Sequence, residues 1–151
     1  MAFSLRFAPP LGLALVLAAS AGLAWATGAD VIQARREGMK TMKSDVRILS
    51  EMIEGQGVVD PQTAARSARS LGEAARAIPG LFPEGSARPP STARLAVWAD
   101  WAQFTDLARQ LSDAAEDLER AAVNGSFEDA SDAFVRVTRS CRNCHRAFKE
   151  D

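Results

Sequence analysis

The sequence predicts an all-α protein, an antiparallel four-helix bundle, from three observations. Tyrosine is absent, β-branched residues are sparse, and alanine and arginine are abundant, a composition that favours helix. Four successive segments repeat apolar residues at spacings of three and four, which places these residues on one face of a helix. Junctions rich in glycine and proline separate the segments, so that each helix can turn back along the one before it.

The N-terminal residues have the pattern of an export signal. Arg6 supplies a positive charge, Leu11 to Leu23 is apolar, and Ala24-Trp25-Ala26 resembles a cleavage site. We therefore expect residues 1–26 to be a cleaved signal peptide and residues 27–151 to form the bundle. An uncleaved membrane anchor is the alternative, because the uncharged stretch is long enough to span a bilayer.

The length of 151 residues is that of a single domain. The chain has 18 basic and 19 acidic residues, a net charge of −1 with histidine neutral. Removal of the signal peptide would leave 17 basic and 19 acidic residues, a net charge of −2. We expect no nucleic-acid partner because there is no basic excess, and no stable membrane association once the signal is cleaved.

Caps and helix breakers locate the first two helices. The first is expected from about Asp30 to Glu54, with Gly55 and Gly57 ending it. The second begins at Asp60-Pro61, an N-cap residue followed by proline at the first helical position. Pro79-Gly80 stops it.

A long connection and two further helices complete the expected bundle. The stretch from Pro79 to Pro90 is rich in proline and glycine and is expected to be a loop. The third helix is expected from near Ser91 to Val123, with Asn124-Gly125 closing it. The fourth opens at Ser126, and Asp129 three residues later approximates a capping box.

The apolar stripes define the expected core. The core-facing residues are Ile32, Arg35, Met39, Met42, Val46, Leu49 and Ile53 in the first helix; Ala64, Ala68, Leu71, Ala75 and Ile78 in the second; Val97, Trp101, Phe104, Ala108, Leu111, Ala115, Leu118 and Ala122 in the third; and Phe127, Ala130, Phe134, Val137, Cys141, Cys144 and Phe148 in the fourth.

The most specific signal lies in the last helix, in Cys141-Arg142-Asn143-Cys144-His145. Cys-x-x-Cys-His is the attachment motif of a c-type haem, in which the cysteines bind the porphyrin and the histidine binds the iron. Cys141 and Cys144 are the two cysteines of the chain, and His145 is its one histidine. Positions i, i+3 and i+4 share one side of a helix. We therefore expect one covalent haem c inside the bundle, near the C-terminal helix.

Three other interpretations of the motif remain open. A dithiol redox site usually lies at the start of a helix, whereas this motif lies late in one. A zinc site needs about four ligands, and only three cluster here. A non-haem exported bundle with a Cys141–Cys144 disulfide would leave the adjacent histidine unexplained.

Arg35 interrupts the apolar stripe of the first helix. A buried guanidinium without a partner is costly, so we expect an anion near it, and a haem propionate suits an arginine fork. Met39, one helical turn later on the same face, would then cover the iron face opposite His145. The alternatives are an Arg35 side chain that extends to solvent and Met39 and Met42 as ordinary core residues.

A four-helix chain with this motif in its last turns resembles the class II cytochromes c, in particular cytochrome c′. The segment Asp30 to Met39 is similar to the first helix of that family, and Cys141 to Lys149 is similar to its last helix. The resemblance covers nearly the whole mature chain. It implies a periplasmic homodimer that binds NO or CO at five-coordinate iron.

The resemblance also implies roles for individual residues. In the family, the arginine matching Arg35 contacts a propionate and the residue matching Met39 covers the distal face. The basic residue matching Lys149 lies beside the proximal histidine, and a loop near Gly85-Ser86 touches the haem edge. This chain has Lys149 where arginine is frequent, and Phe148 where tyrosine is frequent.

These observations leave three functions open. The first is a periplasmic haem protein that transfers electrons, binds small gases, or does both, with a redox partner that the sequence does not identify. The second is a low-spin electron carrier with His145 and Met39 as ligands. The third is the non-haem bundle with a disulfide. We expect no enzymatic catalysis, because no nucleophile–base arrangement accompanies the motif.

Overall fold

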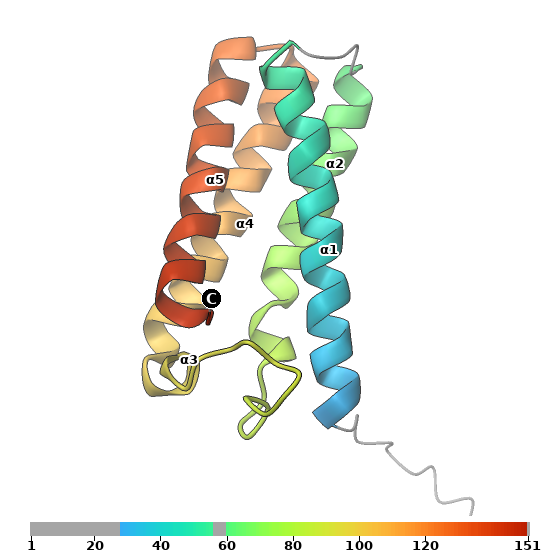
Figure 1. Cartoon of the computed structure of the whole chain (residues 1–151). Helices are drawn as coiled ribbons and strands as arrows, with labels where there is room; N and C mark the ends of the chain where they lie inside the picture. The colour runs from blue at the N-terminus through green and yellow to red at the C-terminus, as the bar shows by residue number, and fades with distance from the viewer. Residues whose placement is uncertain (1–27, 56–59, 151) are drawn as a thin grey trace, which may run out of the picture.

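The computed structural model describes residues 28–55 and 60–150. It confirms the predicted all-α bundle: the four long helices are α1 (Gly28–Ile53), α2 (Pro61–Ala77), α4 (Trp101–Asn124) and α5 (Phe127–Phe148) (Figure 1). Two short elements, η1 (Pro79–Leu81) and α3 (Ala96–Ala99), lie in the long connection between α2 and α4. The predicted signal peptide, residues 1–26, lies outside the described residues, as does Gly57.

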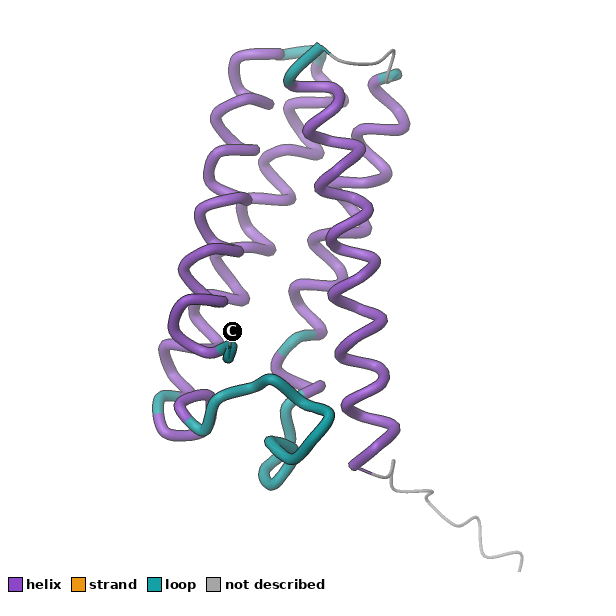
Figure 2. The backbone as a smooth tube through the Cα atoms, viewed as in Figure 1, coloured by secondary structure: helices purple, strands orange, loops and turns teal. Residues whose placement is uncertain are grey.

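The four long helices run antiparallel to one another in chain order, and each packs against two others. α2 packs most extensively on α4, and α4 on α5, whereas α1 contacts α5 least. Figure 2 shows the long connection crossing the end of the bundle at which α5 ends, below α1 and α5. This loosely packed side, between α1 and α5, is where a cavity can form.

The helix ends follow the expected capping chemistry. The side chain of Asp60 accepts a hydrogen bond from the Thr63 amide (Oδ1···N 3.0 Å), which begins α2. The Ser126 hydroxyl accepts one from the Asp129 amide (3.3 Å), which begins α5. Gly125 ends α4 with φ of 71°, a left-handed conformation that glycine adopts without strain.

The predicted start of the third helix at Ser91 is wrong. Only the single turn of α3 precedes a break at Asp100, whose φ and ψ of −127° and 60° are not helical. The Asp100 side chain then accepts a hydrogen bond from the Gln103 amide, so it caps α4. Ser91 does not cap a helix, because its hydroxyl accepts hydrogen bonds from the Arg35 side chain and the Ala93 amide.

Most of the predicted core is confirmed. The five residues of the second predicted stripe are buried, four of them in α2 and Ile78 directly after it, as are Phe104 to Ala122 of the α4 stripe. Small side chains let α2 and α4 approach closely: a Cβ added at Gly72 would lie 3.5 Å from the Ala115 side chain. The buried residues form one continuous cluster that spans the bundle.

Two aromatic residues assigned to the core are instead at the surface. Trp101 is 40% exposed and Phe127 is 62% exposed. Each is the first residue of its helix, where no neighbouring turn covers it. The apolar stripe also missed Asp45, a buried carboxylate on α1 that accepts a hydrogen bond from the Ser70 hydroxyl on α2 (2.8 Å).

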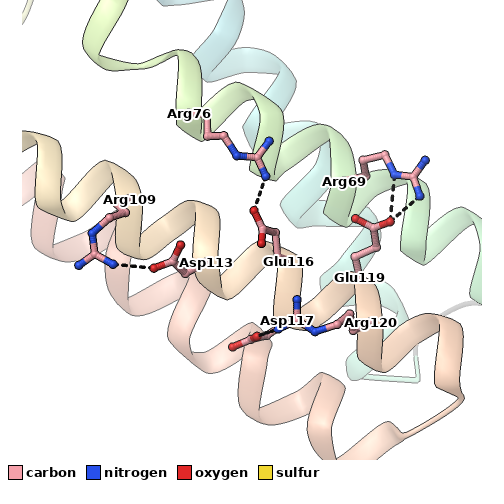
Figure 3. A network of polar contacts seen from close by, with 8 residues as sticks. All are labelled: Arg69, Arg76, Arg109, Asp113, Glu116, Asp117, Glu119 and Arg120. Carbon is pink, nitrogen blue, oxygen red and sulfur yellow. Dashed lines mark hydrogen bonds and ion pairs between the residues drawn. The ribbon is translucent and has the colours of Figure 1, made fainter.

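Ion pairs line the outer face of the α2–α4 interface (Figure 3). Arg69 and Arg76 of α2 pair with Glu119 and Glu116 of α4. Exposed pairs of this kind contribute about 0–1 kcal/mol each. They therefore add little stability to a contact that small side chains make closely packed.

Within residues 28–55 and 60–150, none of the helices combines the length and the apolar character that a bilayer-spanning helix requires.

We predict that Ser70→Ala destabilises the bundle in a pH-dependent way. Burial raises the pKa of Asp45, and the hydrogen bond from Ser70 opposes that rise. The free energy of unfolding should fall by about 1–3 kcal/mol near pH 7, where Asp45 is ionised and loses its donor. Asp45 itself adds stability as the pH falls through its raised folded pKa. The loss should therefore shrink as the pH falls below the ordinary aspartate pKa of about 3.9, because the carboxyl becomes protonated in both states.

Urea denaturation followed by circular dichroism, near pH 7 and near pH 3.5, checks this. Ser44→Ala, at an exposed position on α1, is the control and should change little at either pH. An equal loss at both pH values would contradict the interpretation.

Candidate cofactor site

The motif residues lie in the last two turns of α5. Cys141 and Cys144 are half-buried and pack against the core cluster, and they are free thiols. His145 follows on the exposed side of the same turns. The structure therefore brings the three predicted residues together in one short stretch of helix, late in that helix as the sequence indicated.

A cavity of about 450 Å³ opens beside this stretch. This volume is within the usual range for small-molecule and cofactor sites. Its walls are mostly aliphatic and aromatic, and they come from α1, the end of α2, the segment after Pro90, the start of α4 and the end of α5. The lining residues are Ile32, Arg35, Arg36, Met39, Lys40, Ile78, Phe82, Pro90, Ser91, Thr92, Ala93, Phe104, Cys144, His145, Phe148 and Lys149.

The surroundings of His145 favour the neutral form of the imidazole, which is the form that binds metals. Partial burial lowers its pKa because desolvation disfavours the imidazolium, and the nearby Lys149 ammonium lowers it further. Neutral imidazole is a common metal ligand in proteins. Around neutral pH the histidine can therefore offer a nitrogen lone pair to a metal in the cavity.

The pKa values of the two cysteine thiols are raised, whereas a reactive redox dithiol has a lowered thiol pKa. Burial raises the pKa of Cys144 to about 11, with the neighbouring Cys141 adding to the rise. Burial also raises the pKa of Cys141. Reactive dithiols depend on a lowered thiol pKa, so the environment of these thiols argues against the dithiol interpretation. No group of three or more His, Cys, Asp and Glu residues in the described part of the chain could hold a metal ion by itself.

Arg35 is buried, as predicted, but its partners are neutral oxygens. Nε donates to the Leu81 carbonyl (3.2 Å), and Nη2 donates to the same carbonyl (2.8 Å) and to the Ser86 hydroxyl (2.8 Å). Nη1 donates to the Ser86 carbonyl (3.3 Å) and the Ser91 hydroxyl (2.8 Å). The five bonds use all five N–H groups of a guanidinium.

Arg35 does not need an anion as a hydrogen-bond partner, because all five of its N–H donors are already used. The charge still has no ion-pair partner among the described residues, and burial lowers the arginine pKa without neutralising it. Since Arg35 lines the cavity, an anionic group bound there would lie near an uncompensated positive charge. Contact with a propionate stays a prediction.

The other predicted site residues have different positions. Met39 is half-buried and lines the cavity from α1, across from the α5 wall. Lys149 lines the cavity and is exposed, with Nζ donating to the Glu150 carbonyl. Ser86 does not line the cavity; it is buried behind Arg35, and its hydroxyl donates to the Pro83 carbonyl.

An aromatic cluster at the cavity wall was not assigned to the site from the sequence. Phe82 lies edge-on to Phe104 (4.7 Å between ring centroids), which in turn lies edge-on to Phe148 (5.3 Å). The guanidinium carbon of Arg35 stacks 3.7 Å from the Phe82 centroid. Phe104 and Phe148 were predicted as core, but Phe82 lies in a loop where no periodic pattern marks it.

The cavity is closed at one end by two segments far apart in the chain. Ala93 and Lys149 form an isolated antiparallel bridge. The Arg94 amide donates to the Phe148 carbonyl (2.9 Å), and the Glu150 amide donates to the Thr92 carbonyl (2.8 Å). Helical periodicity carries no signal for such extended pairing.

The residues present fit a c-type haem. The two half-buried thiols and the neutral imidazole are the donor set of the attachment motif. The apolar walls suit a porphyrin ring, and Arg35, Arg36, Lys40 and Lys149 offer positive charge to its carboxylates.

Comparisons with known proteins agree with this site. A family model described as "Cytochrome C'" matches residues 30–149. A cytochrome c′ of Pararhodospirillum photometricum is 28% identical over 120 residues, covering 79% of this chain and 95% of the relative. The crystal structure of cytochrome c′ from Rubrivivax gelatinosus superposes with a TM-score of 0.74 at 25% identity, covering 82% of this chain and 97% of that one.

A second similar structure is the nitric oxide complex of a cytochrome c′ variant from Alcaligenes xylosoxidans. It has a TM-score of 0.76 at 24% identity and covers 84% of this chain and 99% of its own. Another variant of that protein is described with carbon monoxide bound. At this identity the likeness supports the fold alone.

We predict that Arg35→Lys loosens the connection between α2 and α4. Lysine has three donors and no planar fork, so at least two of the five hydrogen bonds to residues 81–91 are lost. The free energy of unfolding should fall by about 3 kcal/mol, the order expected for hydrogen bonds to a charged group. Amide hydrogen exchange in this connection should also become faster.

Hydrogen-exchange mass spectrometry and urea denaturation measure both effects. Arg36→Lys, at the exposed neighbouring position, is the matched control. Unchanged exchange across residues 81–91 in the Arg35 variant would show that the connection does not depend on this guanidinium.

Proposed function

The chain belongs to the cytochrome c′ family, and we propose that it is a periplasmic haem protein, not an enzyme, that transfers an electron or binds NO or CO at one open iron face. Family membership implies covalently bound haem c with its iron. The half-buried Cys141 and Cys144 lie beside a cavity for which the non-haem alternative offers no role. Export through the predicted signal peptide and assembly into a homodimer belong to this proposal.

The single observation that carries the proposal is the cavity beside the attachment motif. Cys144 and His145 form one wall, and Cys141 lies one turn before them. The two thiols would hold the porphyrin, and the imidazole would bind the iron from the α5 side. When bound, the haem supplies an iron that can change its oxidation state or accept a diatomic ligand.

The opposite wall explains why one iron face would stay open to small ligands. Met39 and Ile32 of α1 are the apolar residues there. The second histidine that many haem proteins place on this side does not exist in the chain. Arg35 also lines the cavity, but its N–H groups are all bound to the connecting segment.

An apolar wall of this kind favours some diatomic ligands over others. NO and CO bind ferrous iron without needing a hydrogen-bond donor, whereas bound O₂ is stabilised by one. We therefore propose that the protein prefers NO and CO to O₂. The structures of the Alcaligenes xylosoxidans protein with these gases support the proposal by analogy of fold.

A second function, low-spin electron transfer, is favoured by the position of Met39. Its side chain lines the same cavity as His145, from the opposite wall. Met39 would then bind the iron from α1 and supply the methionine ligand that low-spin relatives take from their first helix. Met42 is a weaker candidate, because it is buried in the core and does not line the cavity.

We predict that the ferrous protein has a high-spin spectrum that changes when CO is added. Met39→Ala should keep that spectrum and raise CO affinity by about tenfold, equivalent to about 1.4 kcal/mol, since it removes a side chain from the ligand's path. Absorption spectra with and without CO provide the measurement. Met42→Ala is the control and should leave CO affinity unchanged.

The same spectra distinguish the two functions. A sharp low-spin ferrous spectrum that CO does not alter would contradict the gas-binding proposal. If the oxidised protein has a methionine–iron charge-transfer band that Met39→Ala abolishes, the second function is correct. A mature protein without haem, made where haem is attached, would exclude both.

A further inference from the structure

Basic residues form two stripes beside the cavity, one on α1 and one on α5. Arg36, Lys40, Lys43 and Arg47 follow one another at spacings of four, three and four, and all are exposed. Arg139, Arg142, Arg146 and Lys149 follow at spacings of three, four and three, and all are exposed. Such spacings place each set along one face of its helix.

Each stripe reaches the cavity at one end. Arg36, Lys40 and Lys149 line it directly. On α1, Asp45 faces α2 through Ser70, and by helical geometry the basic stripe lies on the opposite flank of the buried face. On α5, Arg136 faces α4 through an ion pair with Asp117, and the basic stripe lies on the side away from it, beyond His145.

Few acidic groups offset this charge. From Ala133 to Lys149 the sequence has five basic residues and no acidic one, and none of the four in the α5 stripe forms an ion pair within the described residues. In the α1 stripe, Lys40 pairs with Glu37 and Arg47 with Glu51, whereas Arg36 and Lys43 have no ion-pair partner among the described residues.

This basic face contrasts with the rest of the molecule. The whole chain is slightly acidic, with a net charge of −1. At physiological ionic strength the Debye length is about 8 Å, so an approaching molecule responds to the nearest charges and not to the total. Lys43, Arg139, Arg142 and Arg146 do not line the cavity, and all four are exposed.

We propose that this face of α1 and α5, which we call the basic rim, is the docking surface for a redox partner protein with an acidic surface. Carboxylates of the partner would meet the two stripes and bring its redox centre to the cavity edge, where one electron passes between the partner and the iron. The proposal rests on the electron-transfer role in the proposed function. Charge complementarity of this kind raises association rates and orients partners.

The test uses two inorganic electron acceptors of opposite charge with the ferrous holoprotein. Hexacyanoferrate(III) is an anion and tris(phenanthroline)cobalt(III) is a cation, and each takes one electron from the iron. If the basic rim controls encounter, the rate with the anion falls about tenfold as ionic strength rises from about 10 mM to about 300 mM, and the rate with the cation rises. A protein governed by its net negative charge gives the opposite signs.

Two double variants with the same net charge test whether the position of the basic residues or the total charge of the protein controls the rate. Lys43→Gln/Arg142→Gln removes two rim charges that neither line the cavity nor have ion-pair partners in the described structure. Arg66→Gln/Arg120→Gln removes two charges from α2 and α4. The first should reduce the salt dependence with the anionic acceptor by half or more, and the second should leave it unchanged.

A binding measurement adds a readout independent of electron transfer. Poly-L-glutamate, used as an acidic probe in isothermal titration calorimetry, should bind the unaltered protein and the α2/α4 variant with similar affinity, and the rim variant at least several-fold more weakly. Phosphatidylglycerol vesicles test a membrane surface instead. Stronger, rim-dependent binding to these vesicles than to poly-L-glutamate would overturn the proposal in favour of a lipid surface.

The remaining outcomes separate this proposal from the function on which it rests. Oxidation by both acceptors, with salt effects that follow net charge or that change equally in both double variants, would overturn the docking surface alone. A ferrous protein that reduces neither acceptor would overturn the electron-transfer role, and the docking proposal with it.

Discussion

The guanidinium of Arg35 is the interaction on which the rest of the site depends. Its five donors connect α1 to Leu81, Ser86 and Ser91, and its flat face covers the Phe82 ring. A connection with little regular structure is thereby held against α1, and the cavity wall takes its shape from both. A buried charge is tolerated here because every N–H group is hydrogen-bonded and aromatic π-density covers one face.

Most of the helical framework could be predicted from the sequence, because caps and periodicity are local signals. Asp60, Ser126 and Gly125 are where capping chemistry placed them, and the α2 stripe is buried throughout. Prediction failed where tertiary contacts compete with local preference. Ser91 has the side chain of an N-cap residue, but its hydroxyl accepts from Arg35.

The sequence was enough to predict a set of haem-binding residues, but not which residues form the rest of the cavity wall. The attachment motif predicts Cys141, Cys144 and His145 as the haem-binding residues because its spacing is highly specific. Phe82 was not identified, since its place in the wall depends on the folding of a loop. The anion inferred for Arg35 followed from its burial, but neutral oxygens from that same loop turned out to be its hydrogen-bond partners. Sequence distance hides such contacts, as Arg35 and Ser86 are 51 positions apart.

The close approach of α2 to α4 at Gly72 and Ala115 has a further consequence. The tightest seam of the bundle lies away from the cavity, and α1 and α5 meet loosely beside it. The interface that contributes most packing and the cavity beside the attachment motif thus lie in different parts of the bundle. Substitutions in the cavity wall, for example at Ile32 or Met39, can therefore change the surroundings of the haem without disturbing the α2–α4 contact that stabilises the bundle.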